Sequence, residues 1–187
     1  MKEHHWFGVT LSIKNCYGMT PLTIYGTNAG VDEPGTDVTG TRVQVSHDGD
    51  RAPSKSAPQE IDPTSPRVGD FRIPRIVAEI VSGRPIHLAV VDGIEGIAGG
   101  EGPWYPEVRH VSPGVLVAGF NPVSTDAVSM ALMGFDPKAK RGTPPFDSCD
   151  NFLDFAEYFE IGSRDLSKIE VLGTPIADAL YPSRVPV

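Results

Sequence analysis

The stretch Ile86–Trp104, IHLAVVDGIEGIAGGEGPW, decides how the rest of the chain is interpreted. It opens with an apolar segment, 86–91, whose lack of alternation is typical of a strand buried on both faces, as in parallel sheets. That segment runs directly into Asp92 and Gly93, and a glycine-dense loop with two glutamates follows. Open α/β folds bind ligands beyond the carboxyl ends of such strands, and glycine lets the backbone approach a ligand closely. The stretch therefore predicts the floor of a binding site.

Helical patterns flank this strand on both sides. Before it, apolar residues recur at helical spacing over 71–83, with Asp70 as the expected N-cap. After it, Gly114–Phe120 predicts a second buried strand, and Asn121 with Pro122 provides a favoured N-cap and first helical position. Strands that alternate with helices predict an α/β fold with a mostly parallel sheet and flanking helices.

The remaining elements are shorter. Val9–Ile13 alternates apolar and hydroxyl residues and predicts a strand. Ser148 is the expected cap of a helix with an aromatic stripe over 152–159, and Ile169–Leu172 predicts a final strand. Between the Val9–Ile13 strand and the helix at 71–83, residues 27–69 are rich in Pro, Gly, Asp, Ser and Thr. This composition predicts a long loop-like insertion in one domain that spans 1–187.

Composition excludes several classes of function. The net charge of -8, without a Lys/Arg cluster, argues against nucleic acid and anionic membranes as partners. No segment approaches the roughly 20 apolar residues of a membrane span, and residues 1–15 lack a signal-peptide pattern, so the localisation stays open. Cys16 and Cys149 are expected to be free thiols, and two cysteines are too few for a four-thiolate iron–sulfur cluster.

Polar residues gather where the predicted strands end. If the Val9–Ile13 and 86–91 strands are parallel, Lys14, Asn15 and Asp92 emerge at one edge of the sheet, and Asn121 joins them. The free N–H groups at the helix start after Asn121 favour an anion there. This convergence predicts a site for a small anionic or carbonyl-bearing ligand.

Carboxylates near that edge predict a divalent metal. Asp92, Glu101 and Asp126 form an oxygen-rich set that suits Mg²⁺ or Mn²⁺. His5 is a candidate acid–base group, whereas adjacent His4 and His5 on a strand would point to opposite faces and could not easily share one metal.

Each residue also has a structural explanation. Asn121 can be only an N-cap, Asp126 can favour the helix dipole, and Asp92 can bond its own turn backbone. Glu101 can be a solvated loop carboxylate. Motifs of dinucleotide-binding, phosphate-loop, zinc-protease and serine-hydrolase type are absent from the sequence.

Three segments in order, HHWFGVTLSIKNCYG, LAVVDGIEGIAGGEGPW and GVLVAGFNPVSTDAVSMALMGFDP, resemble the family named domain of unknown function 362. The resemblance spans most of the chain from Lys2 to Gly173, apart from the polar insertion. It implies that the chain is the carboxyl-terminal half of the usual family domain, so that a missing amino-terminal half or a partner chain would complete it. It implies no established activity.

The chain departs from the family pattern at several positions. Glu3 stands where a small hydroxyl residue is usual, and Cys16 with Tyr17 replaces a Leu-Phe-like pair. Asn121 replaces an Asp that is common in the Asp-Pro-Val-x-x-Asp pattern, which puts a metal role at that position in doubt. Iron–sulfur cysteine clusters, which some members carry, do not occur here.

These observations support one main hypothesis and two alternatives. The main one is an enzyme in which His5, Lys14 and Asp92 carry the chemistry while Asn15, Gly93, Gly100 and Asn121 bind the substrate. The first alternative is a non-catalytic module that binds a small ligand or cofactor, with the insertion at 27–69 as a lid or contact arm. The second is a degenerate half-domain that retains core packing but no site.

Overall fold

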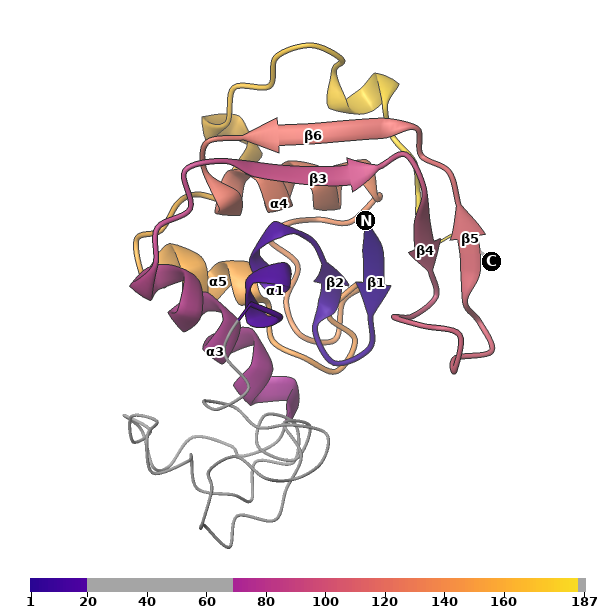
Figure 1. The fold of residues 1–187 in the computed structure, drawn as a ribbon, viewed down its shortest axis with the longest axis horizontal. Coiled ribbons are helices and arrows are strands. Elements are labelled where there is room, and N and C mark those ends of the chain that lie inside the picture. Colours follow the sequence, from indigo (N-terminus) through magenta and orange to yellow (C-terminus); the bar gives the residue numbers. More distant parts are fainter. Residues whose placement is uncertain (20–68, 185–187) are drawn as a thin grey trace, which may run out of the picture.

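The computed structural model of the chain describes residues 1–19 and 69–184, and Figure 1 shows how strands and helices are arranged in them. The predicted insertion at 27–69 lies outside these ranges except for residue 69, which begins a helix. The mixture of strands and flanking helices confirms the α/β class.

A long, bent β-ribbon dominates the fold. Its first arm comprises β3 (Ala89–Gly93) and β4 (Gly96–Ala98), and its second arm comprises β5 (Arg109–Val111) and β6 (Val115–Gly119). β3 pairs with β6 and β4 pairs with β5, both antiparallel. Figure 1 shows the ribbon turning sharply between its two halves, with the loop from 99 to 108 at its far tip.

The bend contains one unmatched residue. Gly93 faces Val115 and Gly96 faces Val111, so two residues of the first arm lie opposite three of the second. The N–H of Gly114 donates to the carbonyl of Ile94 at 3.4 Å within this bulge. An extra residue in one strand of an antiparallel pair bends the pair and increases its twist.

The β4–β5 half of the ribbon joins a second pair of strands. β1 (Lys2–His4) pairs in parallel with β4 and antiparallel with β2 (Gly8–Thr10), which gives the strand order β2-β1-β4-β5. Among the described residues the pairing is therefore mainly antiparallel, which corrects the expectation of a mostly parallel sheet. The reason is that no helix separates β3 from β6, and a parallel pair needs such a crossover.

The first helix differs most from the sequence prediction. α1 spans Ser12–Tyr17, so the predicted strand Val9–Ile13 is real only up to Thr10, the end of β2. Lys14 and Asn15 therefore lie on a helix and not at the end of a strand, and β2 and β3 belong to different sheets. The predicted convergence of Lys14, Asn15 and Asp92 at one sheet edge is wrong for these two reasons.

The later helices follow the predictions more closely. α3 (Gly69–Gly83) ends at the predicted residue but begins before Asp70, which therefore lies inside the helix instead of capping it. α4 (Pro122–Leu132) has Asn121 as its N-cap, as predicted. α5 (Phe152–Tyr158) is capped by Asn151 and not by Ser148.

Short 3-10 turns complete the chain at Leu166–Lys168 and Ile176–Asp178, and 169–172 forms no strand, contrary to the prediction.

The core lies between the ribbon, the helices and the β1–β2 pair. Phe7 stacks on Phe152 with ring centroids 4.5 Å apart, and Phe146 meets Phe152 edge-on at 6.2 Å. α4 packs under the β3–β6 half of the ribbon, and its Val123, Ala127 and Met130 are fully buried. The opposite face of that half is apolar and open, with Leu88, Val90, Leu116 and Phe120 all more than half exposed.

Neither Cys16 nor Cys149 forms a disulfide, as predicted. Within the described ranges, no helix has the length and apolar character that a membrane span requires.

Candidate functional site

An open cleft of about 630 Å³ lies where β1, the tip of the ribbon and the last described residues meet. Its size falls within the range of small-molecule sites, roughly 300–1,000 Å³. Charged and imidazole side chains from four separate parts of the chain line it, namely Glu3, His4, His5, Glu107, Arg109, Asp147 and Arg184. Such a concentration of titratable groups in one concavity marks the candidate site.

A buried ion pair forms one wall of the cleft. Glu3, only 3% exposed, accepts from Nε of Arg184 at 2.8 Å and from the N–H of Gly99 at 3.3 Å. Arg184 also pairs with Asp147 at 2.7 Å. Burial lowers the pKa of Arg184, but the hydrogen bonds and charges of Asp147 and Glu3 outweigh it and raise that pKa overall. Arg184 therefore keeps its positive charge in this wall, where it pairs with both carboxylates.

Arg109 supplies the second guanidinium. It extends from β5, and its Nη2 donates to the carbonyl of Ser183. A guanidinium has five N–H donors in a planar fork. This contact uses one of them, and no carboxylate among residues 1–19 and 69–184 forms an ion pair with Arg109, so the fork suits an anionic ligand in the cleft.

Both histidines of the His4–His5 pair line the cleft, although alternation along a strand predicts opposite faces. β1 ends at His4, so His5 already belongs to the following turn and alternation no longer applies. His4 Nδ1 accepts from the N–H of Trp6 at 3.2 Å, which places the proton of the neutral ring on Nε2. The His5 ring stacks on Tyr105 with centroids 4.3 Å apart and an interplanar angle of 9°.

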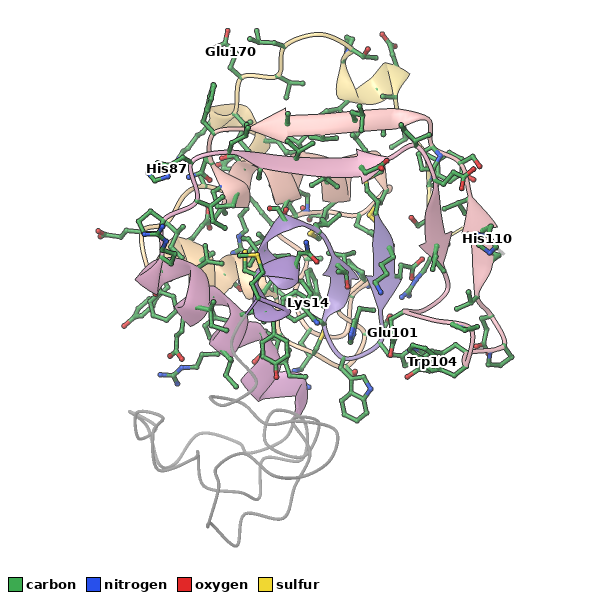
Figure 2. The ribbon with its side chains drawn as sticks, viewed as in Figure 1. Lys14, His87, Glu101, Trp104, His110 and Glu170 are labelled. Atoms are coloured by element: carbon green, nitrogen blue, oxygen red, sulfur yellow. The ribbon has the colours of Figure 1, made fainter. Side chains whose placement is uncertain are left out.

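Glu101 lies at the rim, held by the turn that follows β1. Its Oε2 accepts from the N–H of His5 at 3.1 Å, and its side chain is hydrogen-bonded to Tyr105. Burial raises the pKa of Glu101, but the His5 N–H, the charge of His4 and the Tyr105 contact lower it below its usual value overall. The carboxylate is therefore ionised at neutral pH. Figure 2 shows Glu101 beside Trp104 at the tip of the ribbon.

Of the predicted site residues, His5 and Gly100 line the cleft and Glu101 borders it. Asp92 lies elsewhere: it is exposed, and its Oδ1 accepts from the N–H of Ile94 at 2.8 Å, the turn arrangement considered as its structural explanation. Its carbonyl accepts from the amino terminus at 2.6 Å. Gly93 is enclosed by Met1 and Val115, which leaves no room there for a ligand.

Of three other predicted residues, two have structural contacts and one is exposed. Asn121 caps α4 by accepting from the N–H of Ser124 at 3.0 Å, and it donates to the carbonyl of Ile161 at 2.7 Å. Lys14 places its ammonium 5.7 Å from the ring centroid of Phe7 and 5.2 Å from that of Tyr17. Asn15 is exposed on α1.

Asp126 is fully buried and its oxygens are occupied. Oδ1 accepts from the N–H of Ser12 at 2.9 Å and from its hydroxyl at 2.5 Å, and Oδ2 accepts from the N–H of Ile13 at 3.0 Å. Leu11, the N-cap residue of α1, has no capping side chain, so Asp126 caps that helix from α4. Burial raises the pKa of Asp126 to about 6 against the opposing effect of these hydrogen bonds.

These positions do not fit the predicted magnesium or manganese set of Asp92, Glu101 and Asp126. Nowhere in residues 1–19 and 69–184 do three His, Cys, Asp or Glu side chains meet in an arrangement that could hold a metal ion. The donors of Asp126 already occupy both of its oxygens, and Asp92 is committed to its turn. The metal stays a prediction that this geometry does not support.

Sequence reasoning missed Glu3, Arg109, Asp147 and Arg184. They lie in four separate segments, and no local motif connects them, since Glu3 and Arg184 are 181 residues apart. The one local signal in the sequence is the pair of adjacent histidines, but strict alternation along a strand assigns their side chains to opposite faces.

Comparison with known proteins gives one match. Residues 1–131 match the model of the family described as "Domain of unknown function (DUF362)". No curated protein and no solved structure is significantly similar to the chain.

Proposed function

The chain belongs to the DUF362 family, whose description assigns no activity, and from its cleft we propose an enzyme that moves a proton on a small anionic, carbonyl-bearing substrate. The observation that carries the proposal is the meeting of both imidazoles of the His4–His5 pair with the guanidinium of Arg109 in one cleft of about 630 Å³.

Arg109 serves as the anion anchor. Its remaining N–H donors match the two oxygens of a carboxylate, and such charge-assisted bonds are stronger than neutral ones. Arg184 is neutralised by Glu3 and Asp147, so it shapes the wall and leaves the anchoring to Arg109.

The histidines supply the proton chemistry. His5 is held by its stacking on Tyr105 and acts as the base that removes a proton from the carbon next to the substrate carbonyl. The electron pair of that C–H bond forms the C=C bond of an enolate, and the π pair of the carbonyl moves to its oxygen, which accepts a hydrogen bond from Nε2–H of His4. The imidazolium of His5 then returns a proton to the carbon.

The test is exchange of carbon-bound protons for deuterium in D₂O, followed by NMR with pyruvate and 2-oxoglutarate as probes. The wild-type chain is expected to exchange the protons next to the carbonyl faster than buffer does, and His5→Gln is expected to slow the exchange about 100-fold. His87→Gln is the matched control, because His87 is exposed outside the cleft and lies on the other side of the molecule from Glu101 (Figure 2). Exchange no faster than in buffer with either probe would sink the catalytic proposal.

The second candidate is a non-catalytic module that binds the same ligand class. It is favoured by the exposure of His5 and by the ion pairs that already satisfy Arg184, because a catalytic site usually excludes water. Calorimetric titration separates the two: saturable pyruvate binding that Arg109→Gln weakens, without proton exchange, identifies the binding module.

A further inference from the structure

The loop at the tip of the ribbon presents an aromatic surface next to the cleft. Trp104 is 69% exposed, and its indole lies against Gly102, where any Cβ would collide with the ring. One face of the indole is therefore supported by backbone and the other is open to solvent. Trp6, the other tryptophan of the chain, is 40% exposed and hydrogen-bonds through its side chain to Tyr105.

A hydrogen-bonded network gives this surface a fixed acceptor. The indole N–H of Trp6 donates to the Tyr105 hydroxyl, and that hydroxyl donates to Glu101. With the N–H groups of His5 and of Glu101 itself, the Glu101 carboxylate receives three bonds of the roughly four that a carboxylate accepts. The remaining lone pair suits a hydroxyl group of a ligand.

The surface and the cleft are continuous. His5 lines the cleft through its ring and holds Glu101 through its backbone N–H. Gly100 also lines the cleft, and a Cβ at this position would meet the side chain of Tyr105 at 3.2 Å. A ligand with its anionic group at Arg109 can extend towards this loop along the first arm of the ribbon.

From this arrangement we infer that the loop Gly99–Val108 is a subsite for the ring of a polyhydroxylated ligand, so that the cleft takes a sugar acid. The inference rests on the proposed function, because Arg109 would bind the carboxylate. The C–H face of a sugar ring stacks on the open face of Trp104, whose π-cloud is negative. A ring hydroxyl donates to Glu101.

Other ring-binding chemistries fit less well. A quaternary ammonium group would meet the ammonium of Lys2, which donates to the carbonyl of Glu101 at 3.2 Å, and the two guanidiniums of the cleft. A nucleic acid strand would meet a chain of net charge -8. A quaternary ammonium group also has no N–H or O–H to donate to the remaining lone pair of Glu101.

The test is a titration with three probes: D-glucuronate, which has ring and carboxylate, methyl glucoside, which has the ring only, and pyruvate, which has the carboxylate only. Trp104 lies in this loop and Trp6 hydrogen-bonds to its Tyr105, so tryptophan fluorescence reports ring binding, while calorimetry gives the affinity. Glucuronate is expected to shift the fluorescence saturably and to bind more tightly than either other probe.

Variants identify the residues. Trp104→Ala is expected to weaken glucuronate binding at least about fivefold and Trp104→Phe less, with pyruvate binding unchanged in both. Glu101→Gln should weaken glucuronate binding about tenfold. Trp104 is mostly exposed, so both Trp104 variants should keep the wild-type melting temperature.

The outcomes separate the two proposals. Pyruvate binding without any sugar-induced change overturns the sugar-acid inference alone. Binding of none of the three probes overturns the proposed function with it. A fluorescence response to tetramethylammonium or adenosine but not to glucuronate replaces the sugar acid by that ligand class.

Discussion

Asp126 shows at the scale of one residue how a buried charge can serve the fold. It caps α1 from a position 114 residues away, and its pKa is about 6 in the folded chain against an ordinary value of 3.8. The folded state therefore binds more protons than the unfolded state between these two values. The stability from this group is fully present below the lower value and is lost as the pH rises through about 6.

Asp126→Asn tests this linkage. The rise in the pKa of Asp126 corresponds to roughly 3 kcal/mol. As the pH is lowered from 7.5 to 4, the unfolding free energy of the wild type should therefore increase by about that much relative to that of Asp126→Asn. Urea unfolding at a series of pH values measures the difference. Asp178→Asn, at an exposed carboxylate, is the control and should track the wild type. A pH-independent difference between wild type and Asp126→Asn would contradict the linkage.

The same residue explains why the first helix could not be predicted. Ser12 begins α1 only because Asp126 satisfies the N–H groups of Ser12 and Ile13. The local sequence alternates as a strand does, and no residue near Leu11 provides a cap. A cap that comes from α4 leaves no trace in the local pattern, so Lys14 and Asn15 were placed on the wrong element.

At the scale of elements, the ribbon depends on glycine where its two arms approach. Gly99 has φ +82°, and a Cβ there would collide with the carbonyl of Glu107 across the loop. Gly114 has φ +72°, but nothing lies within 4 Å of the place where its Cβ would be. The two positions share a backbone conformation and differ in crowding.

We therefore expect Gly114→Ala to lower the unfolding free energy by about 1 kcal/mol, the cost of the conformation alone. Gly99→Ala should lower it by about 2 kcal/mol more, because the loop must also move. Gly99→Ala should also weaken ligand binding, since Gly99 lines the cleft and donates to Glu3. Chemical unfolding and pyruvate titration check both effects, and equal losses for the two variants would contradict the role of crowding.

Elements with local signals were predicted well. The strand Val115–Gly119, the Asn121 cap and α4 follow from apolar runs and capping residues next to each other in the chain. The pairing of the strands was not predicted well, because an apolar run does not indicate which other strand lies beside it. β3 and β6 lie on opposite arms of one hairpin-like ribbon and are not members of a parallel sheet.

At the scale of the whole molecule, the last described segment closes the structure. The N–H of Tyr181 donates to the carbonyl of Leu132 at 2.7 Å, and that of Ser183 donates to the carbonyl of Met133 at 2.9 Å. These bonds bring Arg184 to Glu3 at the other end of the chain. Residues near both ends of the given sequence therefore line the cleft together.

Arg184→Ala tests this closure. It leaves the carboxylate of Glu3 buried without its cation, and the loss of one partner of a buried pair typically costs about 3 kcal/mol or more. Because Arg184 is partly exposed and solvent screens its charge, we expect the unfolding free energy to fall by about 2 kcal/mol. Adding Glu3→Gln should restore part of the stability, because it removes the orphaned charge. Thermal and urea unfolding measure both, and Arg75→Ala, which breaks a surface pair with Glu79, should change little. No recovery in the double variant would rule out the buried charge as the cause.

The unmatched residue in the bend restricts how the length of this chain can change during evolution. The two residues that follow Gly93 lie opposite the three residues that precede Val115. This difference sets which side chains of each arm point inward. Losing or gaining a single residue there would turn every side chain in one half of an arm to the opposite face. Insertions and deletions in relatives should therefore accumulate at the tip of the loop, or occur in compensating pairs, and spare the bend.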